Sequence, residues 1–507
     1  MNEEQTKAYT LVRGTGVLQR LWYLYHRLGI WSNILVAAHY TSVDGNGLTK
    51  EVLLDALGTV AMSHPSLWQV FVKRPSSNPG CHGLHTAVLR TIDLDKCIEY
   101  LDDDQGEPGI TSDILEYAHN EWLWTADEPD RPLWKLLVKG RNIIFVYHHS
   151  LGDGVSGMVF HRELLAALNS PTVTKTGGAE HRPNTIIHAN DAAQVPLEPE
   201  DVWDGKDSFM EMLWTTIVSW FVALYYGNAR IYANLPPPKP RLQSATAVAE
   251  PHQRTVTRIS LYRIPANEMS LIIKACRANQ TTFTPLLLTM LTIVLATEFY
   301  PDAKVGATRF NFDLRPYLPM SRIGGGTANG TIVNASAGWQ RWHRLAPFRR
   351  VLTTKADETG TPLLDREAVW GLVKEYKEDM TRSTSGKALR NWISVKRAGT
   401  DLENLVNAFE PIGAAVRHTF SVSNIGAFSE VRAGDEERDR GLWQIDDMQF
   451  SAGAVNGNQG THGAIFHVGG VRGGDTVINA TYEDGVVSRE MAEGIVKRAV
   501  ARILEIV

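Results

Sequence analysis

The chain has 507 residues, of which 43 % are hydrophobic and 21 % are charged. Compact chains of this length bury about three quarters of their unfolded surface, so the sequence can form its own core, and its composition excludes disordered and fibrous proteins. The 51 basic and 56 acidic side chains give a net charge of −5, without a basic stripe. We therefore expect no nucleic-acid partner, because proteins that bind nucleic acids carry an excess or a stripe of positive charge.

The cysteines and the N-terminus indicate the cellular setting. Cys81, Cys97 and Cys276 are too few, and odd in number, for a disulfide framework. The opening Met-Asn-Glu-Glu-Gln has neither the cationic start nor the apolar run of a secretory signal. Both features predict a reducing, cytoplasmic setting. Cys81 and His82 lie near His85, and we expect no metal at this cluster.

Hydrophobic periodicity predicts alternating helices and strands in the first part of the chain. They are a helix over 17–29, a strand over 32–42, a helix over 48–63, strands over 133–138 and 143–147, and a helix over 157–168. Lys139-Gly-Arg-Asn142 joins the last two strands and favours a β-hairpin. The second of these strands leads into a polar turn that contains glycine.

The same alternation returns after residue 255. The predicted elements are strands over 254–264, 305–312, 414–422, 463–468 and 476–482, and helices over 265–278, 286–299 and 488–506. The intervening stretch is irregular and contains Leu235-Pro-Pro-Pro-Lys-Pro240, which is typical of a stiff connector. We predict a mixed α/β protein with a first half over 1–170, a connector over 171–255 and a second half over 256–507.

The connector contains an apolar segment, Phe209–Tyr226, whose only charged residue is Glu211. As a helix its 18 residues would span about 27 Å, close to the thickness of a bilayer core. Its Trp and Tyr residues are typical of membrane interfaces. Two interpretations remain open: a helix packed over the junction of the halves or against an apolar acceptor channel, and a peripheral membrane contact by insertion.

The most informative segment is Tyr147-His-His-Ser-Leu-Gly-Asp-Gly154. Histidine suits general-base chemistry because its ordinary pKa is about 6.5. An acid four residues after the second histidine could fix the loop, orient a ring or pair with a cation. A shared zinc ion is disfavoured, because His148 and His149 on a strand point to opposite faces. Taken alone, these residues are also compatible with an ordinary polar turn that has no catalytic role.

This segment matches an HHxxxDG pattern and resembles the superfamily of condensation domains and CoA-dependent acyltransferases. Three further segments strengthen the resemblance: Pro132-Leu-Trp134, Phe312-Asp-Leu-Arg-Pro316 and Phe420-Ser-Val-Ser-Asn-Ile-Gly426. The last is similar to the SNxG strand of that superfamily. Over most of the chain, their order and spacing resemble the fungal alcohol acetyltransferase branch, although Gln19 stands where that branch leads us to expect an acid.

The resemblance implies two chloramphenicol-acetyltransferase-like halves set in a V, with the active-site channel between them. It implies that His149 is the general base and that no acyl-enzyme forms. Asp153 is expected to act structurally, pointing away from the substrate and pairing with Arg315 from the second half. His148 would support the loop, and Gly154 would let the backbone turn tightly.

Ser423 and Asn424 are polar residues on an otherwise apolar strand. They are candidates for substrate binding in the channel, and the alternative is that they only make loop hydrogen bonds.

The function implied by the resemblance is acyl-CoA-dependent O-acylation, specifically acetyl transfer to a hydrophobic alcohol, as in secondary metabolism. Acetyl-CoA or another acyl-CoA would be the co-substrate, with no bound cofactor and no metal, and the pseudo-dimeric architecture favours a monomer. The enzymatic alternatives are N-acylation of an amine and a donor held by a carrier protein. A non-catalytic, membrane-associated binding protein on the same fold is the third alternative.

Overall fold

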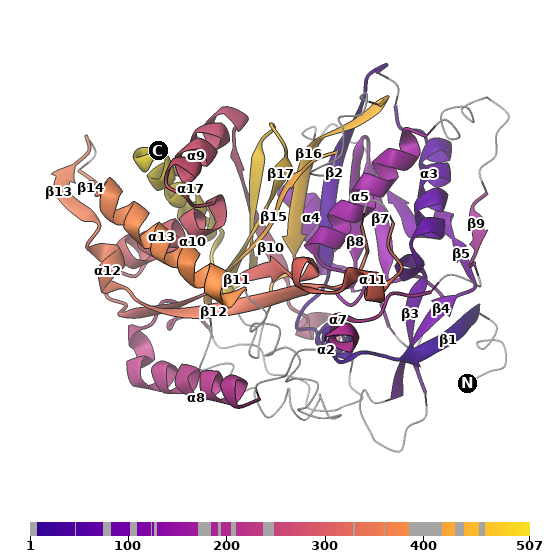
Figure 1. The fold of residues 1–507 in the computed structure, drawn as a ribbon, viewed down its shortest axis with the longest axis horizontal. Coiled ribbons are helices and arrows are strands. Elements are labelled where there is room, and N and C mark those ends of the chain that lie inside the picture. The colour runs from indigo at the N-terminus through magenta and orange to yellow at the C-terminus, as the bar shows by residue number, and fades with distance from the viewer. Residues whose placement is uncertain are drawn as a thin grey trace.

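The computed structural model describes most of the chain. The described residues are 8–45, 47–74, 83–101, 109–122, 124–125, 129–170, 184–190, 194–203, 209–236, 248–327, 330–358, 360–384, 418–430, 441–455 and 462–507. Within them, two large sheets form two lobes side by side (Figure 1). This arrangement confirms the expected mixed α/β fold with two lobes.

The first lobe is built on a five-stranded sheet in the order β16-β2-β8-β7-β6. Its strands are β16 (Trp443–Ala452), β2 (Ile34–Ser42), β8 (Asn142–Tyr147), β7 (Trp134–Lys139) and β6 (Ile98–Tyr100). Its helices are α2 (Val17–Arg27), α3 (Lys50–Ser63), α4 (Ser112–Asn120) and α5 (Gly154–Leu168). Two small sheets flank it: β1 (Tyr9–Gly14), β4 (Leu84–Leu89) and β3 (Gln69–Lys73), and β5 (Thr91–Asp93) with β9 (Ile186–His188).

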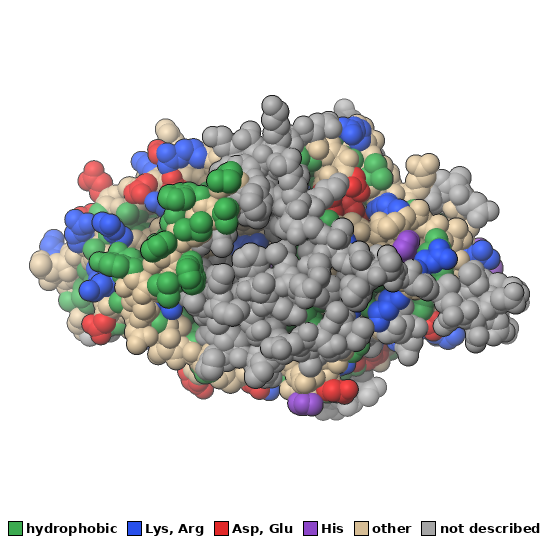
Figure 2. All heavy atoms as spheres, turned by 90° about the horizontal axis from the view of Figure 1, so that it is seen from below, with side chains coloured by type: hydrophobic (Ala, Val, Ile, Leu, Met, Phe, Trp, Pro, Cys, Tyr) green, Lys and Arg blue, Asp and Glu red, His purple; other side chains and the backbone are tan. Residues whose placement is uncertain are grey.

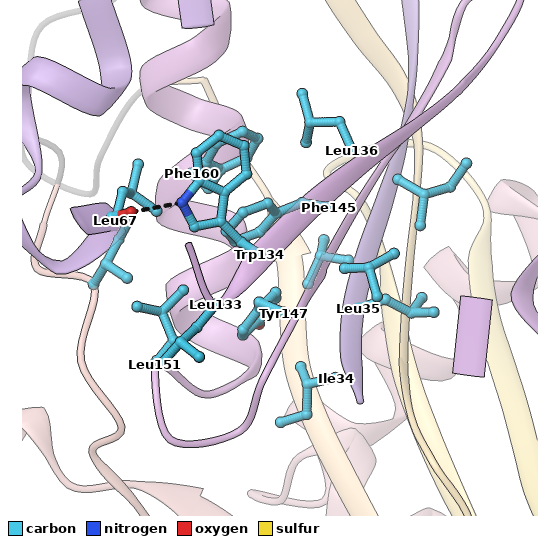
Figure 3. Packing of buried hydrophobic residues seen from close by; sticks show 14 of the residues in the cluster. Ile34, Leu35, Leu67, Leu133, Trp134, Leu136, Phe145, Tyr147, Leu151 and Phe160 are labelled. Carbon is cyan, nitrogen blue, oxygen red and sulfur yellow. Dashed lines mark hydrogen bonds between the residues drawn. The ribbon is translucent and has the colours of Figure 1, made fainter. Parts of the chain in front are cut away.

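The core of the first lobe fixes the end of strand β8. The rings of Phe145 and Phe160 stack at 3.8 Å, which joins the sheet to α5. The Trp134 indole donates a 2.7 Å hydrogen bond to the Leu67 carbonyl, so this large buried side chain has its polar atom satisfied (Figure 3). Tyr147 is also fully buried beside these residues, and the chain leaves the strand from this rigid point.

The second lobe is built on a six-stranded sheet in the order β10-β18-β17-β15-β11-β12. Its strands are β10 (Thr257–Ile264), β18 (Thr476–Glu483), β17 (His462–Val471), β15 (His418–Phe428), β11 (Val305–Asp313) and β12 (Ser336–Arg344). Its longer helices are α9 (Ala266–Ala278), α10 (Phe283–Val294), which continues as a π-turn over Leu295–Phe299, α13 (Arg366–Ser383) and α17 (Arg489–Ile506). Shorter elements are α7 (Pro199–Val202), α11 (Met320–Ile323), α12 (Ala346–Arg349), β13 (Leu352–Ala356) and β14 (Pro362–Leu364).

Strand β16 departs from the simple division of the chain. Although it comes from the stretch assigned to the second half, it pairs antiparallel with β2 in the sheet of the first lobe. It also packs against β17 of the second lobe. Part of the second half of the sequence therefore belongs to the first lobe. The remaining domain boundaries stay a prediction.

Most of the expected elements lie close to their predicted positions. Several short strands of the first lobe were not foreseen, and neither were α4, α13, β12 and β16. Residues 414–417 of one predicted strand lie outside the described residues. The apolar segment of the connector is helix α8 (Phe209–Tyr226), as expected, and it stands apart from both sheets (Figure 1).

A search for membrane-spanning helices in the described part of the chain finds no single helix of sufficient length and hydropathy. One bent pair of helices, α9 together with residues 283–299, is long and apolar enough to span a membrane when the two are counted together. Helix α10 is almost entirely buried in the second core, whereas α9 buries only Ile272 and Cys276.

Candidate active site

The predicted motif forms a tight loop between β8 and α5, where the two lobes meet. Asp153 is the N-cap of α5, and its carboxylate accepts a 2.9 Å hydrogen bond from the Ser156 amide. The Ser156 hydroxyl lies 3.2 Å from the Asp153 amide, which completes a capping box. The Tyr147 hydroxyl donates to the Asp153 carbonyl, so both ends of the loop are held together.

His149 lies in an aromatic enclosure, with 8 % of its surface exposed. Its ring stacks on Trp22 of α2, with centroids 3.9 Å apart, and Trp31 approaches edge-on at 4.9 Å. Nδ1 lies 3.1 Å from the Gly152 carbonyl and 3.1 Å from the amide nitrogen of Asn334. Asn334 also donates a 2.9 Å hydrogen bond to the His149 carbonyl, so a residue of the second half holds the backbone of His149. An amide N–H can donate only to an unprotonated Nδ1, so a protonated Nδ1 bonds the Gly152 carbonyl and not Asn334.

These contacts determine the protonation state of His149. Burial lowers its pKa to about 4, and the positive charge of Arg309 adds to that effect. The ring is therefore neutral at pH 7. If Nδ1 keeps its proton to donate to the Gly152 carbonyl, Nε2 carries the lone pair, and no described residue pairs with Nε2. This tautomer can accept a proton from a bound molecule.

Asp153 and Arg315 form a buried, two-pronged ion pair, with Arg315 nitrogens 3.0 and 3.1 Å from the two carboxylate oxygens. Asp153 also accepts a 2.8 Å hydrogen bond from the Ala335 amide, and Arg315 donates to the Val333 carbonyl. Burial alone raises the pKa of the Asp153 carboxyl, but the Arg315 charge and these hydrogen bonds hold the pKa below its usual value. Both carboxylate oxygens of Asp153 are therefore engaged by partners other than His149, and its expected structural role stays a prediction.

His148 and Gly154 have packing roles in the loop. The His148 ring is buried among His26, Phe71 and Trp124, and its Nδ1 accepts from the Ser150 amide. A Cβ on Gly154 would lie 2.5 Å from the Ile425 side chain and 2.8 Å from Phe450. Gly154 therefore allows close contact with Ile425 of β15 and Phe450 of β16, and its expected part in a tight turn stays a prediction.

Ser423 and Asn424 lie on opposite faces of β15. Ser423 is half-buried and is the register partner of Asn311 on β11. Asn424 donates a 2.9 Å hydrogen bond to the Thr284 hydroxyl and accepts from the Gly426 amide. Asn424 also lines a cavity of about 540 Å³ beside α9. The two candidates therefore do not share one subsite.

Four residues of the site were not identified from the sequence: Trp22, Trp31, Ser156 and Asn334. Ser156 could have been found, because it stands three residues after Asp153 in a helix-start pattern. Asn334 lies 185 residues from His149 and carries no local signal. Among the described residues there is no cluster of metal-ligating side chains, and Cys81 and His82 lie outside them.

The comparisons with known proteins agree with this geometry. Residues 14–459 match the model of the alcohol acetyltransferase family, so the chain belongs to that family. It is 20 % identical to the probable alcohol acetyltransferase FCK4 of Fusarium pseudograminearum, over 96 % of this chain and 93 % of the relative.

Solved structures show the same fold. The chain is similar to TRI3 trichothecene 15-O-acetyltransferase from Fusarium sporotrichioides, with a TM-score of 0.64 and 12 % identity over 99 % of this chain and 98 % of that one. It is also similar to the first condensation domain of the calcium-dependent antibiotic synthetase, with a TM-score of 0.54 and 12 % identity over 98 % and 97 % of the two chains.

The first prediction concerns the buried ion pair. Replacing Arg315 by Gln leaves the Asp153 carboxylate buried without its counter-ion, so we expect the free energy of unfolding to fall by about 3–5 kcal/mol. Asp153→Asn should cost a similar amount, and the double variant should lose less than the sum. Urea denaturation measures all three. Arg498→Gln, which breaks an exposed pair with Glu298, is the control and should cost at most about 1 kcal/mol. Strict additivity would contradict the coupling.

The second prediction concerns pH. Burial lowers the pKa of His26, His149 and His161 to about 4 each, below the ordinary value of 6.5. Below pH 6.5 the unfolded chain binds protons that the folded chain does not, so stability is complete above this pH and decreases as the pH falls toward 4. We expect a loss of about 1 kcal/mol per histidine per pH unit. Urea titrations between pH 7.5 and 5 test this, and constant stability would contradict it.

Proposed function

We propose that this protein is an acyl-CoA-dependent O-acyltransferase that transfers an acetyl group to a hydrophobic alcohol, with His149 as general base. One observation carries the proposal. The neutral His149 ring is fixed at the junction of the lobes, and its Nε2 has no partner among the described residues. Membership of the alcohol acetyltransferase family gives the reaction class.

In the proposed reaction, His149 Nε2 takes the proton from the acceptor hydroxyl as its oxygen attacks the thioester carbonyl. The tetrahedral intermediate then collapses, the C–S bond breaks, and the proton passes from the imidazolium to the leaving thiolate. Burial makes His149 a weak base, so proton transfer must accompany attack. Holding both substrates at this junction supplies much of the acceleration.

The cavity beside α9 supports a CoA thioester as donor. Its volume is about 540 Å³, and its lining includes apolar Met269, Ile273 and Phe283 together with Lys274 and Arg277. Apolar walls suit the pantetheine arm and acyl group, and the cations suit phosphates. Asn424 and Gly426 line the cavity one residue either side of Ile425, which packs at Gly154 of the histidine loop.

The third prediction tests this function. Purified protein should release CoA from acetyl-CoA only when an acceptor from a panel of hydrophobic alcohols and amines is present, with the product identified by mass. His149→Ala should reduce turnover by a factor of about 10²–10⁴, because the general base is lost. His188→Ala, an exposed histidine on β9, is the matched control and should leave turnover unchanged.

Each alternative gives a different result in this experiment. Acylated amines in place of esters would indicate N-acylation. Activity only with a carrier-bound acetyl group would indicate the carrier-protein donor. Unchanged turnover in His149→Ala, or neither turnover nor CoA binding, would contradict the proposed mechanism.

We also propose that α8 contacts a membrane surface. Its exposed side chains recur at spacings of four and three residues, which places Met210, Trp214, Ile217, Phe221 and Leu224 on one face. The opposite face packs on the protein through Ala223, which is 2 % exposed. Figure 2 shows hydrophobic side chains gathered where Figure 1 places this helix. Exposed apolar patches of this kind mark interaction sites.

The residue types favour a bilayer over a second copy of the chain. Trp214 and Phe221 are about two thirds exposed, at 68 % and 66 %, and Tyr225 is 84 % exposed. Trp and Tyr are enriched where protein meets lipid headgroups. A helix–helix seam usually carries flanking charged pairs, whereas Glu211 is the single charged residue of the segment. Such contact would suit an enzyme whose acceptor dissolves in lipid.

The fourth prediction tests this contact. Wild-type protein should sediment with phosphatidylcholine–phosphatidylserine vesicles, and Trp214→Glu/Phe221→Glu should stay in the supernatant. Leu271→Glu, at a 56 % exposed leucine on α9, is the control and should still sediment. Light scattering without vesicles separates the alternative, because a dimer that the double variant abolishes would assign the face to a second copy. Absence of wild-type sedimentation would also contradict the proposal.

A further inference from the structure

Strands β11 and β15 each have one apolar and one polar face. Phe310 belongs to the second core, and the neighbouring Thr308 hydroxyl bonds with His343 and Tyr376 on that side. Because side chains alternate along a strand, Arg309 and Asn311 point the other way. In register with them on β15 are Ser421 and Ser423. The sheet therefore turns a polar face away from its own helices.

This polar face looks toward the first lobe. Ser421 is the register partner of Ile465, which belongs to the hydrophobic core of the first lobe. Asp313, two residues beyond Asn311 on the same face, contacts Arg315, which binds Asp153 of the histidine loop. The side chains that alternate with the second core therefore line the junction that contains His149.

Arg309 is a cation on this face without a carboxylate partner among the described residues. Its Nε is buried and makes no hydrogen bond. The guanidinium lies flat over Gly338 of β12, where an added Cβ would come within 2.3 Å of Nε. Its positive charge acts on Tyr25 of α2 and on His149, both in the first lobe.

Gln340 is the register partner of Arg309 on β12, and its side-chain Nε2 is also buried without a hydrogen bond. Buried donors in folded proteins normally have partners. Here two unpaired donors, one of them charged, lie side by side. A guanidinium supplies only donors and a positive charge, and the unpaired Nε2 of Gln340 adds a further donor. This pair suits an acceptor-only anion, above all a carboxylate, which a guanidinium can bind with two hydrogen bonds.

Arg309 and Gln340 lie away from the cavity beside α9, which we propose for the acyl donor. That cavity lies against β15, β17 and β18, whereas Arg309 and Gln340 lie on β11 and β12, at the other edge of the sheet. Gly338 is four residues beyond Asn334, which contacts His149, so at most about 14 Å separates the Cα atoms of these two residues. A single extended acceptor can span this distance.

We propose that Arg309, with Gln340, binds a carboxylate at the far end of the acceptor, whose hydroxyl is presented to His149. The acceptor class is thus a hydroxy acid with an apolar body, which deepens the proposed function and rests on it. Gly338 provides the space that the guanidinium occupies. Arg309 determines which acceptors are used and takes no part in the bond changes.

The fifth prediction tests this acceptor class with ω-hydroxy fatty acids of six to twelve carbons and their methyl esters, using acetyl-CoA as donor. Wild type should show kcat/KM at least tenfold higher for the acid than for the ester at the best chain length. Arg309→Gln should abolish this preference, with a much larger effect on the acid than on the ester, and Arg309→Lys should restore part of it. Arg344→Gln, an exposed arginine on β12, is the matched control and should behave as wild type.

A pH profile distinguishes specificity from a structural role. The Arg309 charge lowers the pKa of His149, so Arg309→Gln should move the acidic limb of the ester profile to higher pH. Gly338→Ala should reproduce the loss of acid preference by displacing the guanidinium, with thermal unfolding showing that both variants fold. Equal use of acid and ester by wild type, or an equal loss for both in Arg309→Gln, would overturn the proposal.

Direct binding separates this proposal from the proposed function. Calorimetry with 10-hydroxydecanoate, without acetyl-CoA, should show binding that Arg309→Gln weakens at least tenfold. Such binding without any acetyl transfer would support the carboxylate site and contradict the transferase. His149-dependent acetylation of esters and simple alcohols, without Arg309-dependent binding of the acid, would support the transferase and overturn the carboxylate site.

Discussion

The active-site geometry depends on one buried ion pair, between Asp153 of the first lobe and Arg315 of the second. The same carboxylate caps α5 and accepts the Ala335 amide, so it fixes the end of the histidine loop and the strand opposite it. Asn334, next to Ala335, then reaches the ring and carbonyl of His149. Buried pairs add little net stability, so its value lies in setting the position of the base against the second lobe.

The two lobes are held together by more than this pair. Strand β16 belongs to the second half of the sequence, but it pairs with β2 in the sheet of the first lobe and packs on β17 of the second lobe. Phe450 of that strand lies against Gly154 at the start of α5, where a side chain would collide. The ring environment of His149 is thus assembled from α2 and the residues after it, the motif loop and the segment just before β12, and none of these parts forms the site alone.

Hydrophobic periodicity predicted many of the helices and strands, because it marks segments with one apolar face, but it missed α4, α13, β12 and β16. It predicted α8 to the residue and α2, α3 and α17 closely. The motif identified His149 and Asp153, and the resemblance implied the partner of Asp153. The remaining site residues were not found because their roles come from tertiary contact. In the sequence, Trp22 looks like an ordinary apolar residue of a helix and Trp31 like an apolar residue of a loop. Asn334 is a polar residue in a stretch without hydrophobic periodicity. Likewise, no local sequence pattern indicates that β16 pairs in the sheet of the first lobe.

The second sheet offers separate regions for the two substrates of the proposed reaction. Its strands β15, β17 and β18 carry the apolar cavity with Lys274 and Arg277, which suits a long thioester with phosphates. Its edge at β11 and β12 carries the buried donors of Arg309 and Gln340. Ser423 and Asn424 lie on opposite faces of β15, which pairs directly with β11, so the two regions are neighbours in the sheet. Because the positive charge of Arg309 disfavours the imidazolium of His149, an anion bound there would make the base stronger. An acceptor that carries its own carboxylate would therefore assist the removal of its own proton.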